Sequence, residues 1–181
     1  MVGSITFITG NQAKVEWLRR HITTPVDHQK LDIPEIQSLE LKEVVKYKAE
    51  EAFRQLQLPL LVEDTSLRFT ALGRLPGPLI KWFLDELGTE GLCKLLDSYD
   101  DRTAVAEVVY GLHTGQEVVL FGATVHGRIA NSPRGANGFG WDNAFIPEGS
   151  EKTWGEMNQE EQNNTSLRET AIIKLNAFLD R

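Results

Sequence analysis

The stretch Leu60-Leu61-Val62-Glu63-Asp64-Thr65-Ser66-Leu67 decides the fold, because a short apolar run meets two carboxylates and two hydroxyls there. We expect Leu60–Val62 to form a buried strand that delivers these polar side chains to the rim of an α/β sheet, where open sheets of this class bind ligands. If both carboxylates lie in the strand, Glu63 and Asp64 point to opposite faces, so only one of them needs to enter a site. The alternative is a strand end that meets an acidic turn.

The composition is that of an ordinary globular protein. Hydrophobic residues make up 41% and charged residues 25% of the 181 residues, which predicts one domain over residues 1–181, or two lobes sharing a cleft, with a real core. The net charge is −7, which argues against a general binder of nucleic-acid backbones. An acidic chain that binds a small polyanion needs local lysines or a metal ion.

The expected compartment follows from cysteine usage and from the missing targeting patterns. Cys93 is the single cysteine, so an intramolecular disulfide and a cysteine-rich metal site are both excluded, as in a reducing compartment. The sequence shows no apolar run of membrane-spanning length and no basic-then-apolar signal pattern at its N-terminus. We therefore expect a cytoplasmic protein that has no membrane partner.

Hydrophobic periodicity predicts a mixed α/β fold in which helices flank a strand-rich middle. Strands are expected at Ile5–Ile8, Val26–Ile33, Leu60–Val62, Thr103–Leu112, Glu117–Gly122, Thr124–Ile129 and Asn143–Ile146. Helices are expected after Asn11, at Ser38–Leu58, from Ile80 to a C-cap at Gly88, around Leu92–Leu96, after Asn158, and from a capping box at Ser166 and Glu169.

A turn suited to an anion follows the first strand. Thr9-Gly10-Asn11 leads into a helix whose first turn carries Lys14. Free backbone N–H groups and the positive end of the helix dipole face such a turn, so it can bind a phosphate. A cation in a first helical turn opposes the dipole, and an anionic ligand would explain it. The alternative is an ordinary Gly-Asn turn.

Three lysines stand where a polyphosphate would explain them. Lys14 and Lys81 lie in the first turns of their helices, and Lys48 falls on the apolar stripe of the Ser38–Leu58 helix. In an acidic chain this grouping favours a bound polyphosphate. The alternatives are a Lys48 that extends from the edge of the stripe to solvent, and three solvated surface charges.

A glycine-rich loop later in the chain carries two aromatic residues, in the order Gly138-Phe139-Gly140-Trp141-Asp142. A tightly turned loop of this kind can present ring faces on which a nucleic-acid base stacks. Aromatic residues in loops also cap the edge of a core, and both interpretations stay open. His113 and His126 have no nearby second His or Cys, which argues against a zinc site.

Taken in order, these motifs resemble those of the inosine triphosphate pyrophosphatase family over nearly the whole chain. The matching motifs are Thr9-Gly10-Asn11 with Lys14, Pro34-Glu35, Lys48-Ala49, Val62-Glu63-Asp64-Thr65, Leu75-Pro76-Gly77-Pro78 with Lys81-Trp82-Phe83, and Phe139-Gly140-Trp141-Asp142. The resemblance implies a homodimer with an elongated mixed sheet, flanking helices and two lobes around a central nucleotide cleft. It also implies Mg²⁺-dependent hydrolysis of (deoxy)nucleoside triphosphates with a deaminated purine (ITP, dITP, XTP) to the monophosphate and pyrophosphate.

The resemblance also implies roles for individual residues. Water attacks the α-phosphorus, and either Glu63 or Asp64 orients or deprotonates it. Mg²⁺ binds Glu35 and Asp64, while Lys14 and Lys48 complete the catalytic set. The implied substrate-binding residues are Thr9, Gly10, Asn11, Lys14, Lys48, Asp64, Thr65, Ser66, Lys81, Phe139, Gly140, Trp141, Asp142, Gln162, Leu167 and Arg168, the last placed over the purine.

Two positions depart from the family pattern near the expected base site. The family usually has Ser-His-Arg where this chain has Ser166-Leu167-Arg168, and Gln162 replaces an expected lysine. Leu167 cannot donate a hydrogen bond, and loss of a donor to the 6-oxo side of the purine weakens base selectivity. Two alternatives follow, which are the same chemistry with an altered base preference and a nucleotide-binding protein with little catalysis. For Leu167 alone, the alternative is a place on the apolar stripe of the last helix, with Ala171, Leu175 and Phe178.

Overall fold

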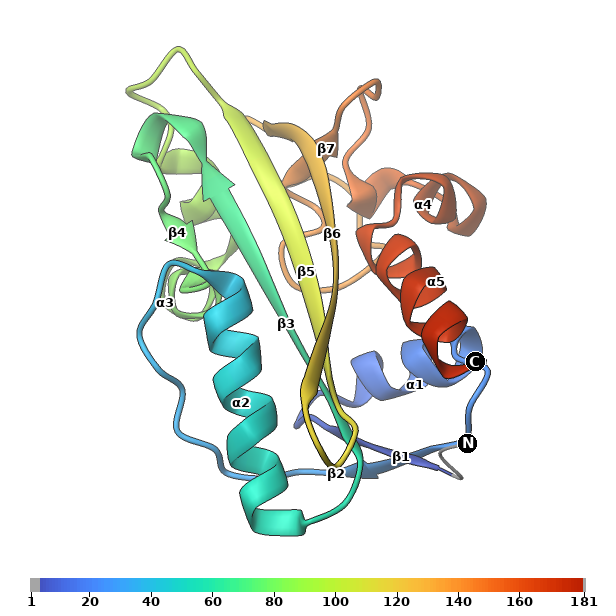
Figure 1. The fold of residues 1–181 in the computed structure, drawn as a ribbon. Helices are drawn as coiled ribbons and strands as arrows, with labels where there is room; N and C mark the ends of the chain where they lie inside the picture. Colours follow the sequence, from blue (N-terminus) through green and yellow to red (C-terminus); the bar gives the residue numbers. More distant parts are fainter. Residues whose placement is uncertain (1–3, 181) are drawn as a thin grey trace. The chain divides into compact units, whose positions relative to one another are not determined.

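The computed structural model describes residues 4–180, and within them it contains a seven-stranded mixed sheet and five α-helices (Figure 1). The strand order is β2-β1-β3-β5-β6-β7, and β4 pairs with β3 off this path. The strands are β1 (Ile5–Ile8), β2 (Val26–Gln29), β3 (Leu60–Phe69), β4 (Pro76–Gly77), β5 (Thr103–His113), β6 (Val118–Ile129) and β7 (Phe145–Pro147). The helices are α1 (Gln12–His21), α2 (Leu41–Leu56), α3 (Ile80–Lys94), α4 (Gln159–Thr165) and α5 (Leu167–Leu179), with 3-10 turns η1 (Thr70–Leu72) and η2 (Trp154–Glu156). The predicted mixed α/β class is confirmed.

Two compact units divide the chain, and each combines segments that are distant in the sequence. Unit 1 comprises the chain up to Asp64, Val108–Ala123 and the segment from Arg168 onward. Unit 2 comprises Thr65–Glu107 and Thr124–Leu167. The boundaries fall inside β3, β5 and β6, so each of these strands contributes one part to each unit. That the whole chain acts as one domain stays a prediction.

The core of unit 1 forms where one face of α2 packs on the sheet. Apolar residues recur every three or four positions along α2, which gives the helix a single buried stripe. Gly111 of β5 approaches this stripe so closely that an added Cβ would lie 2.7 Å from Val45 Cγ1. The buried cluster consists of Ile8, Leu41, Val45, Ala49, Ala52, Leu60, Val62 and Val109.

β1 organises the parallel part of the sheet. It pairs in parallel with β2, where Ile5 lies opposite Val26, and with β3, where Thr6 lies opposite Leu60. Parallel strands that are covered on both faces have nearly continuous apolar sequences, which is why the Ile5–Ile8 and Leu60–Val62 runs predict strands correctly.

β3 is longer than predicted, and this changes the place of the two carboxylates. The predicted strand ended at Val62, whereas β3 continues to Phe69. The polar residues interrupt the apolar run but not the strand, because Leu67 and Phe69 return to fully buried positions before the chain turns at η1. The prediction that Glu63 and Asp64 stand at the rim of the sheet was wrong, since they lie inside a ten-residue strand.

Other predicted boundaries move by a few residues. α2 begins at Leu41 and not at Ser38, whose hydroxyl accepts a hydrogen bond from Glu40 N and donates one to Glu43. The two strands predicted on either side of Ala123 are the single strand β6. β2 ends earlier than predicted, at Gln29, and β7 begins later, at Phe145.

Gly88 interrupts α3 as the sequence predicts. Its φ of 64° and ψ of 179° are non-helical, and a second helical stretch follows it as far as Lys94. A left-handed φ suits glycine because the residue has no Cβ. In the preceding segment the Leu75–Pro76 peptide is cis, and Gly77 pairs antiparallel with Leu67. Among residues 4–180, no helix is both long and apolar enough to span a membrane.

We predict that Gly127→Ala destabilises unit 2. An added Cβ would lie 2.2 Å from Ile146 O and 2.6 Å from Phe145 Cζ, and the carbonyl cannot retreat without breaking the β6–β7 pairing. The free energy of unfolding should fall by about 2–3 kcal/mol, measured by urea denaturation. The matched control is Gly122→Ala in the same strand, where the nearest atoms are 3.4 Å away. Equal stability of the two variants would contradict the prediction.

Candidate active site

Glu63 is the buried centre of the candidate active site in unit 1. The residue is 4% exposed, and each of its carboxylate oxygens has a cation beside it. Lys14 Nζ, from α1, lies 2.7 Å from Oε2, and Arg168 Nε, from α5, lies 3.5 Å from Oε1. Burial alone would raise the pKa of Glu63, but the charges of Lys14 and Arg168 outweigh it and hold the pKa below its usual value. Glu63 is therefore a buried, charged carboxylate.

The helices that carry these two cations lie side by side in unit 1 (Figure 1). Asn176 of α5 donates from Nδ2 to His21 O at 2.9 Å, and its Oδ1 accepts from Thr23 N at 3.2 Å. Both partners stand at the C-terminal end of α1 or just beyond it. The distance between the helices is thus fixed by directed hydrogen bonds as well as by Glu63.

Asp64 faces the opposite side of β3 and pairs with a different helix. Lys48 Nζ, from α2, lies 3.3 Å from Asp64 Oδ2 and 3.4 Å from Glu35 Oε1. Burial alone would lower the pKa of Lys48, but the charges of Asp64 and Glu35 outweigh it and raise the pKa above its usual value. The prediction that Glu63 and Asp64 point to opposite faces is confirmed by these contacts.

Exposure separates the two neighbouring carboxylates. The side chain of Asp64 is 24% exposed and that of Glu35 is 49% exposed, whereas that of Glu63 is 1% exposed. Lys48 is held by two carboxylates at 19% exposure, so it does not extend to solvent as the alternative interpretation required. Asp64 and Glu35 can therefore reach a ligand from solution, and Glu63 cannot do so without losing its ion pairs.

The Thr9-Gly10-Asn11 turn is built as the sequence predicts. Asn11 caps α1, because its Oδ1 accepts from Lys14 N at 3.3 Å, and Thr9 Oγ1 accepts from Asn11 N at 3.1 Å. The first turn of α1 contains no acidic residue to offset the helix dipole. This end of α1 is therefore electropositive and carries the lysine that reaches Glu63.

The donor set of unit 1 suits Mg²⁺ better than a metal held by protein alone. Asp64 and Glu35 approach the same ammonium group, so two carboxylates converge on one region. Mg²⁺ takes one or two carboxylates and completes its shell with phosphate oxygens and waters. Residues 4–180 contain no group of three or more His, Cys, Asp or Glu side chains that could hold a metal ion. A Mg²⁺ shared with a substrate fits these residues.

In unit 2 the Phe139–Asp142 loop is a tight turn. Asp142 Oδ2 accepts from Phe139 N at 2.8 Å, and Gly138 and Gly140 have φ of 78° and 68°. Trp141 is 6% exposed, and its ring packs on Phe145 and Trp154 with centroid distances of 5.8 Å. Of the two predicted ring faces, that of Trp141 is thus turned into a buried aromatic cluster, and Phe139 is the more exposed ring.

The two residues that depart from the family pattern are both engaged inside unit 2. Gln162 donates from Nε2 to Trp154 O at 2.7 Å, and Leu167 is 2% exposed at the start of α5. Leu167 therefore occupies an apolar buried position, as its alternative interpretation predicts. Trp154 and Thr165 are not among the residues predicted from the sequence, although capping-box spacing at Thr153…Glu156 and at Asn158…Glu161 marks the flanking turns.

The remaining predicted residues of unit 2 lie on β3 and α3. Thr65 and Ser66 follow Asp64 in β3, and Ser66 is 1% exposed. Lys81 lies in the first turn of α3, where it pairs with Asp85 at 2.5 Å and lies 5.5 Å from the centre of the Trp82 ring. At 69% side-chain exposure, Lys81 is a surface cation of unit 2.

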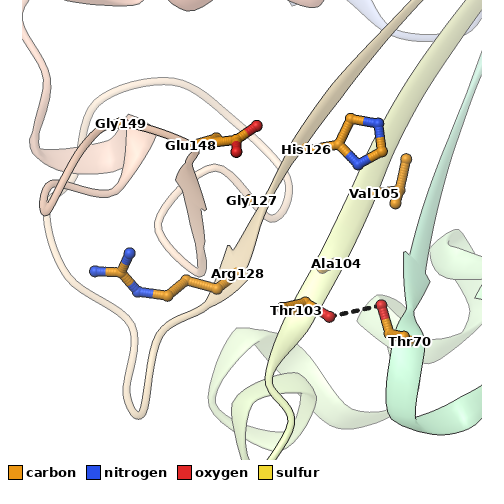
Figure 2. Close-up of a pocket in the computed structure, with 9 residues that line it drawn as sticks. All are labelled: Thr70, Thr103, Ala104, Val105, His126, Gly127, Arg128, Glu148 and Gly149. Carbon is orange, nitrogen blue, oxygen red and sulfur yellow. Dashed lines mark hydrogen bonds between the residues drawn. The ribbon is translucent and has the colours of Figure 1, made fainter.

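Figure 2 shows a pocket of about 480 Å³ in unit 2 that is separate from all of these residues. Its lining includes His126 and Arg128 of β6 and a pair of threonines, Thr70 and Thr103, whose hydroxyls are 2.7 Å apart. None of the residues predicted for nucleotide binding lines it. The pocket therefore contributes nothing to the candidate active site.

Comparisons with known proteins agree with the motifs. The chain is 44% identical over 179 residues to inosine triphosphate pyrophosphatase 2 of Trypanosoma cruzi (strain CL Brener), covering 96% of this chain and 90% of that protein. The structure of the Staphylococcus aureus Ham1 protein superposes with a TM-score of 0.85 and 27% identity, covering 98% of each chain. A nucleoside-triphosphatase / dITP/XTP pyrophosphatase from Mycobacterium abscessus superposes with a TM-score of 0.76 and 26% identity, covering 95% of this chain and 98% of that one.

The family assignment rests on nearly the whole sequence. The sequence profile of the Ham1 family matches residues 5–178, which cover all of unit 2, most of unit 1 and every predicted site residue. This chain belongs to the Ham1 family.

Proposed function

We propose that this protein is a Mg²⁺-dependent pyrophosphatase of (deoxy)nucleoside triphosphates with a deaminated purine (ITP, dITP, XTP), releasing the monophosphate and pyrophosphate. The observation that carries the proposal is the convergence of Asp64 and Glu35 on Lys48, beside the Lys14–Glu63–Arg168 network. Two accessible carboxylates and two lysines in one unit match what a metal–triphosphate complex needs. The names of the T. cruzi and M. abscessus relatives support the same activity.

Asp64 is the residue that orients and deprotonates the attacking water in this proposal. It is accessible, while Glu63 is enclosed by Lys14 and Arg168 and would lose both of these ion pairs if it moved. The water oxygen bonds to the α-phosphorus, its proton passes to the Asp64 carboxylate, and the bond from the α-phosphorus to the bridging oxygen breaks. Glu63 is then a positioning residue that holds Lys14 and Arg168.

Lys14 and Lys48 bind the triphosphate and stabilise the charge that develops on the leaving pyrophosphate. Thr9, Gly10 and Asn11 present the electropositive end of α1 to a phosphate. When bound, Mg²⁺ would be held by Asp64 and Glu35 and would neutralise phosphate charge. We propose Thr65, Ser66 and Lys81 as further contacts to the same substrate.

Base recognition is assigned to the Phe139–Asp142 loop and to Arg168. Phe139 offers the partly exposed ring, and the guanidinium of Arg168 is planar and able to stack on a purine. Leu167 is apolar and lacks the donor that the family pattern leads one to expect, and Gln162, which replaces the expected lysine, donates one amide N–H to Trp154 O. This favours a second candidate, the same chemistry with weaker selectivity for deaminated purines. We also propose a homodimer that works in the cytoplasm.

A substrate panel with Asp64→Asn tests the reaction. With Mg²⁺ and ITP, XTP, dITP, GTP or ATP, the wild-type protein should release pyrophosphate, and the ranking of the five rates measures base selectivity. Asp64→Asn should lower kcat by at least about a hundredfold, because the variant lacks the base. Its free energy of unfolding should change by less than about 1 kcal/mol, since the carboxylate is partly exposed. Release of orthophosphate alone, or full activity of the variant, would refute the assignment.

Glu63→Gln should behave differently from Asp64→Asn. The neutral amide removes the buried negative charge that faces Lys14 and Arg168, so the free energy of unfolding should fall by about 3 kcal/mol. Urea denaturation of both variants at pH 7 measures the contrast. Were Glu63→Gln as stable as Asp64→Asn, the positioning role of Glu63 would be wrong.

Metal dependence is tested through Glu35. Activity should vanish with EDTA and return with Mg²⁺, and Glu35→Gln should raise the Mg²⁺ concentration for half-maximal rate by roughly tenfold or more. Glu50→Gln is the matched control, because Glu50 pairs with Lys46 on the exposed side of α2 at 3.8 Å. An unchanged Mg²⁺ requirement in Glu35→Gln would remove Glu35 from the metal site.

A further inference from the structure

The segment 153–157 holds the Phe139–Asp142 loop from within unit 2. Gly155 N donates to Asp142 O and Gly155 O accepts from Asn137 N, both at 2.9 Å. Residues on either side of the loop pack so tightly on Gly155 that an added Cβ would lie 2.7 Å from Arg134 O and from Asn143 Cα. Two more hydrogen bonds join the same segments, from Thr153 Oγ1 to Arg134 O at 2.7 Å and from Asn137 Nδ2 to Met157 O at 2.9 Å. The segment therefore holds Asp142, the last residue of the loop, together with residues that precede the loop.

α4 in turn forms hydrogen bonds with Trp154 of this segment from two positions one helical turn apart, Gln162 and Thr165. Gln162 Nε2 donates to Trp154 O at 2.7 Å, and Trp154 Nε1 donates to Thr165 Oγ1 at 2.9 Å. Residues three positions apart share one face of a helix, so a single face of α4 holds the backbone and the indole of Trp154 at once. Trp154 is 4% exposed, and both of these bonds are partly buried.

The indole ring of Trp154 also packs against the ring of Trp141, which belongs to the loop. The Trp154 ring lies 4.6 Å from the Phe145 ring and 5.8 Å from the Trp141 ring, measured between centroids. Trp141 and Phe145 also touch each other edge to face at 5.8 Å. Trp141 belongs to the loop, so a shift of Trp154 displaces a loop residue directly.

We propose that α4 sets the position of the Phe139–Asp142 loop through Trp154, and that Gln162 and Thr165 are thereby positioning residues for base selectivity. The inference rests on the proposed function, in which this loop contacts the purine. In this proposal Gln162 acts from behind the loop, with one amide N–H donated to Trp154 O. Thr165 has the same role, although nothing in the motif pattern singles it out.

Three variants test the role of the hydrogen bonds between α4 and Trp154. Thr165→Val removes the acceptor for the indole N–H at nearly constant shape, and Gln162→Met removes the donor to Trp154 O. Each should raise KM for ITP by roughly five- to tenfold with kcat changed by less than about twofold, and each should lower the ratio of kcat/KM for ITP over ATP. Thr165→Ser restores the hydroxyl and should return KM and the ratio to the wild-type values.

Gln159→Met is the matched control on the same helix. Gln159 is exposed and donates to Asn163 at 2.8 Å without reaching Trp154, so KM and the ratio should stay unchanged. The proposal fails if Thr165→Val keeps the wild-type KM and ratio. If KM and the ratio then change in Gln162→Met alone, Gln162 contacts the base directly. The proposal also fails if the variants lower kcat alone, or if Thr165→Ser does not recover.

These outcomes are separable from a failure of the proposed function. If the wild-type protein releases no pyrophosphate from any nucleotide, the proposed function is wrong, and the inference falls with it. If it does, and the variants match the wild type in KM and base ratio, the inference alone is wrong. Urea denaturation midpoints check that every variant is folded.

Discussion

The structure of unit 1 depends on one buried carboxylate that two cations keep charged. Glu63 lies inside β3 with almost no exposure, and a lone ion there would be too costly to bury. Lys14 from α1 and Arg168 from α5 meet it from segments more than a hundred residues apart in the sequence. The contacts that stabilise the buried charge of Glu63 also orient the ammonium group of Lys14 and the guanidinium group of Arg168. The polar core of unit 1 and the candidate active site therefore share the same residues.

The geometry of β3 gives Glu63 and Asp64, which are neighbours in the sequence, different surroundings. Because alternate residues of a strand face opposite ways, Asp64 cannot join the network of its neighbour. It pairs instead with Lys48 of α2, in the company of Glu35, where all three groups keep some exposure. One carboxylate holds structure, and the other is available to a metal ion or to water.

Around Trp154, unit 2 has hydrogen bonds between neutral groups and contacts between rings. The Phe139–Asp142 loop contains Gly140 with a positive φ, and Asp142 O accepts a backbone hydrogen bond from Gly155 N. Trp154 connects that segment to α4 through its carbonyl and its indole. Neutral bonds within a buried aromatic cluster are directional, and they give this loop a defined position even though it is mostly turns.

The amino-acid sequence by itself determined the mixed α/β class, the capped turn at Asn11 and the break at Gly88, because periodicity and cap chemistry are local properties. The resemblance of its motifs to the inosine triphosphate pyrophosphatase family also singled out Lys14, Lys48, Glu35 and Asp64. Only the tertiary structure decided that β3 continues past its polar residues, since burial of Leu67 and Phe69 by distant elements outweighs a local polar interruption. Only the tertiary structure separated a buried Glu63 from an accessible Asp64, and turned Gln162 toward Trp154, because burial and hydrogen-bond partners come from segments that are remote in the sequence.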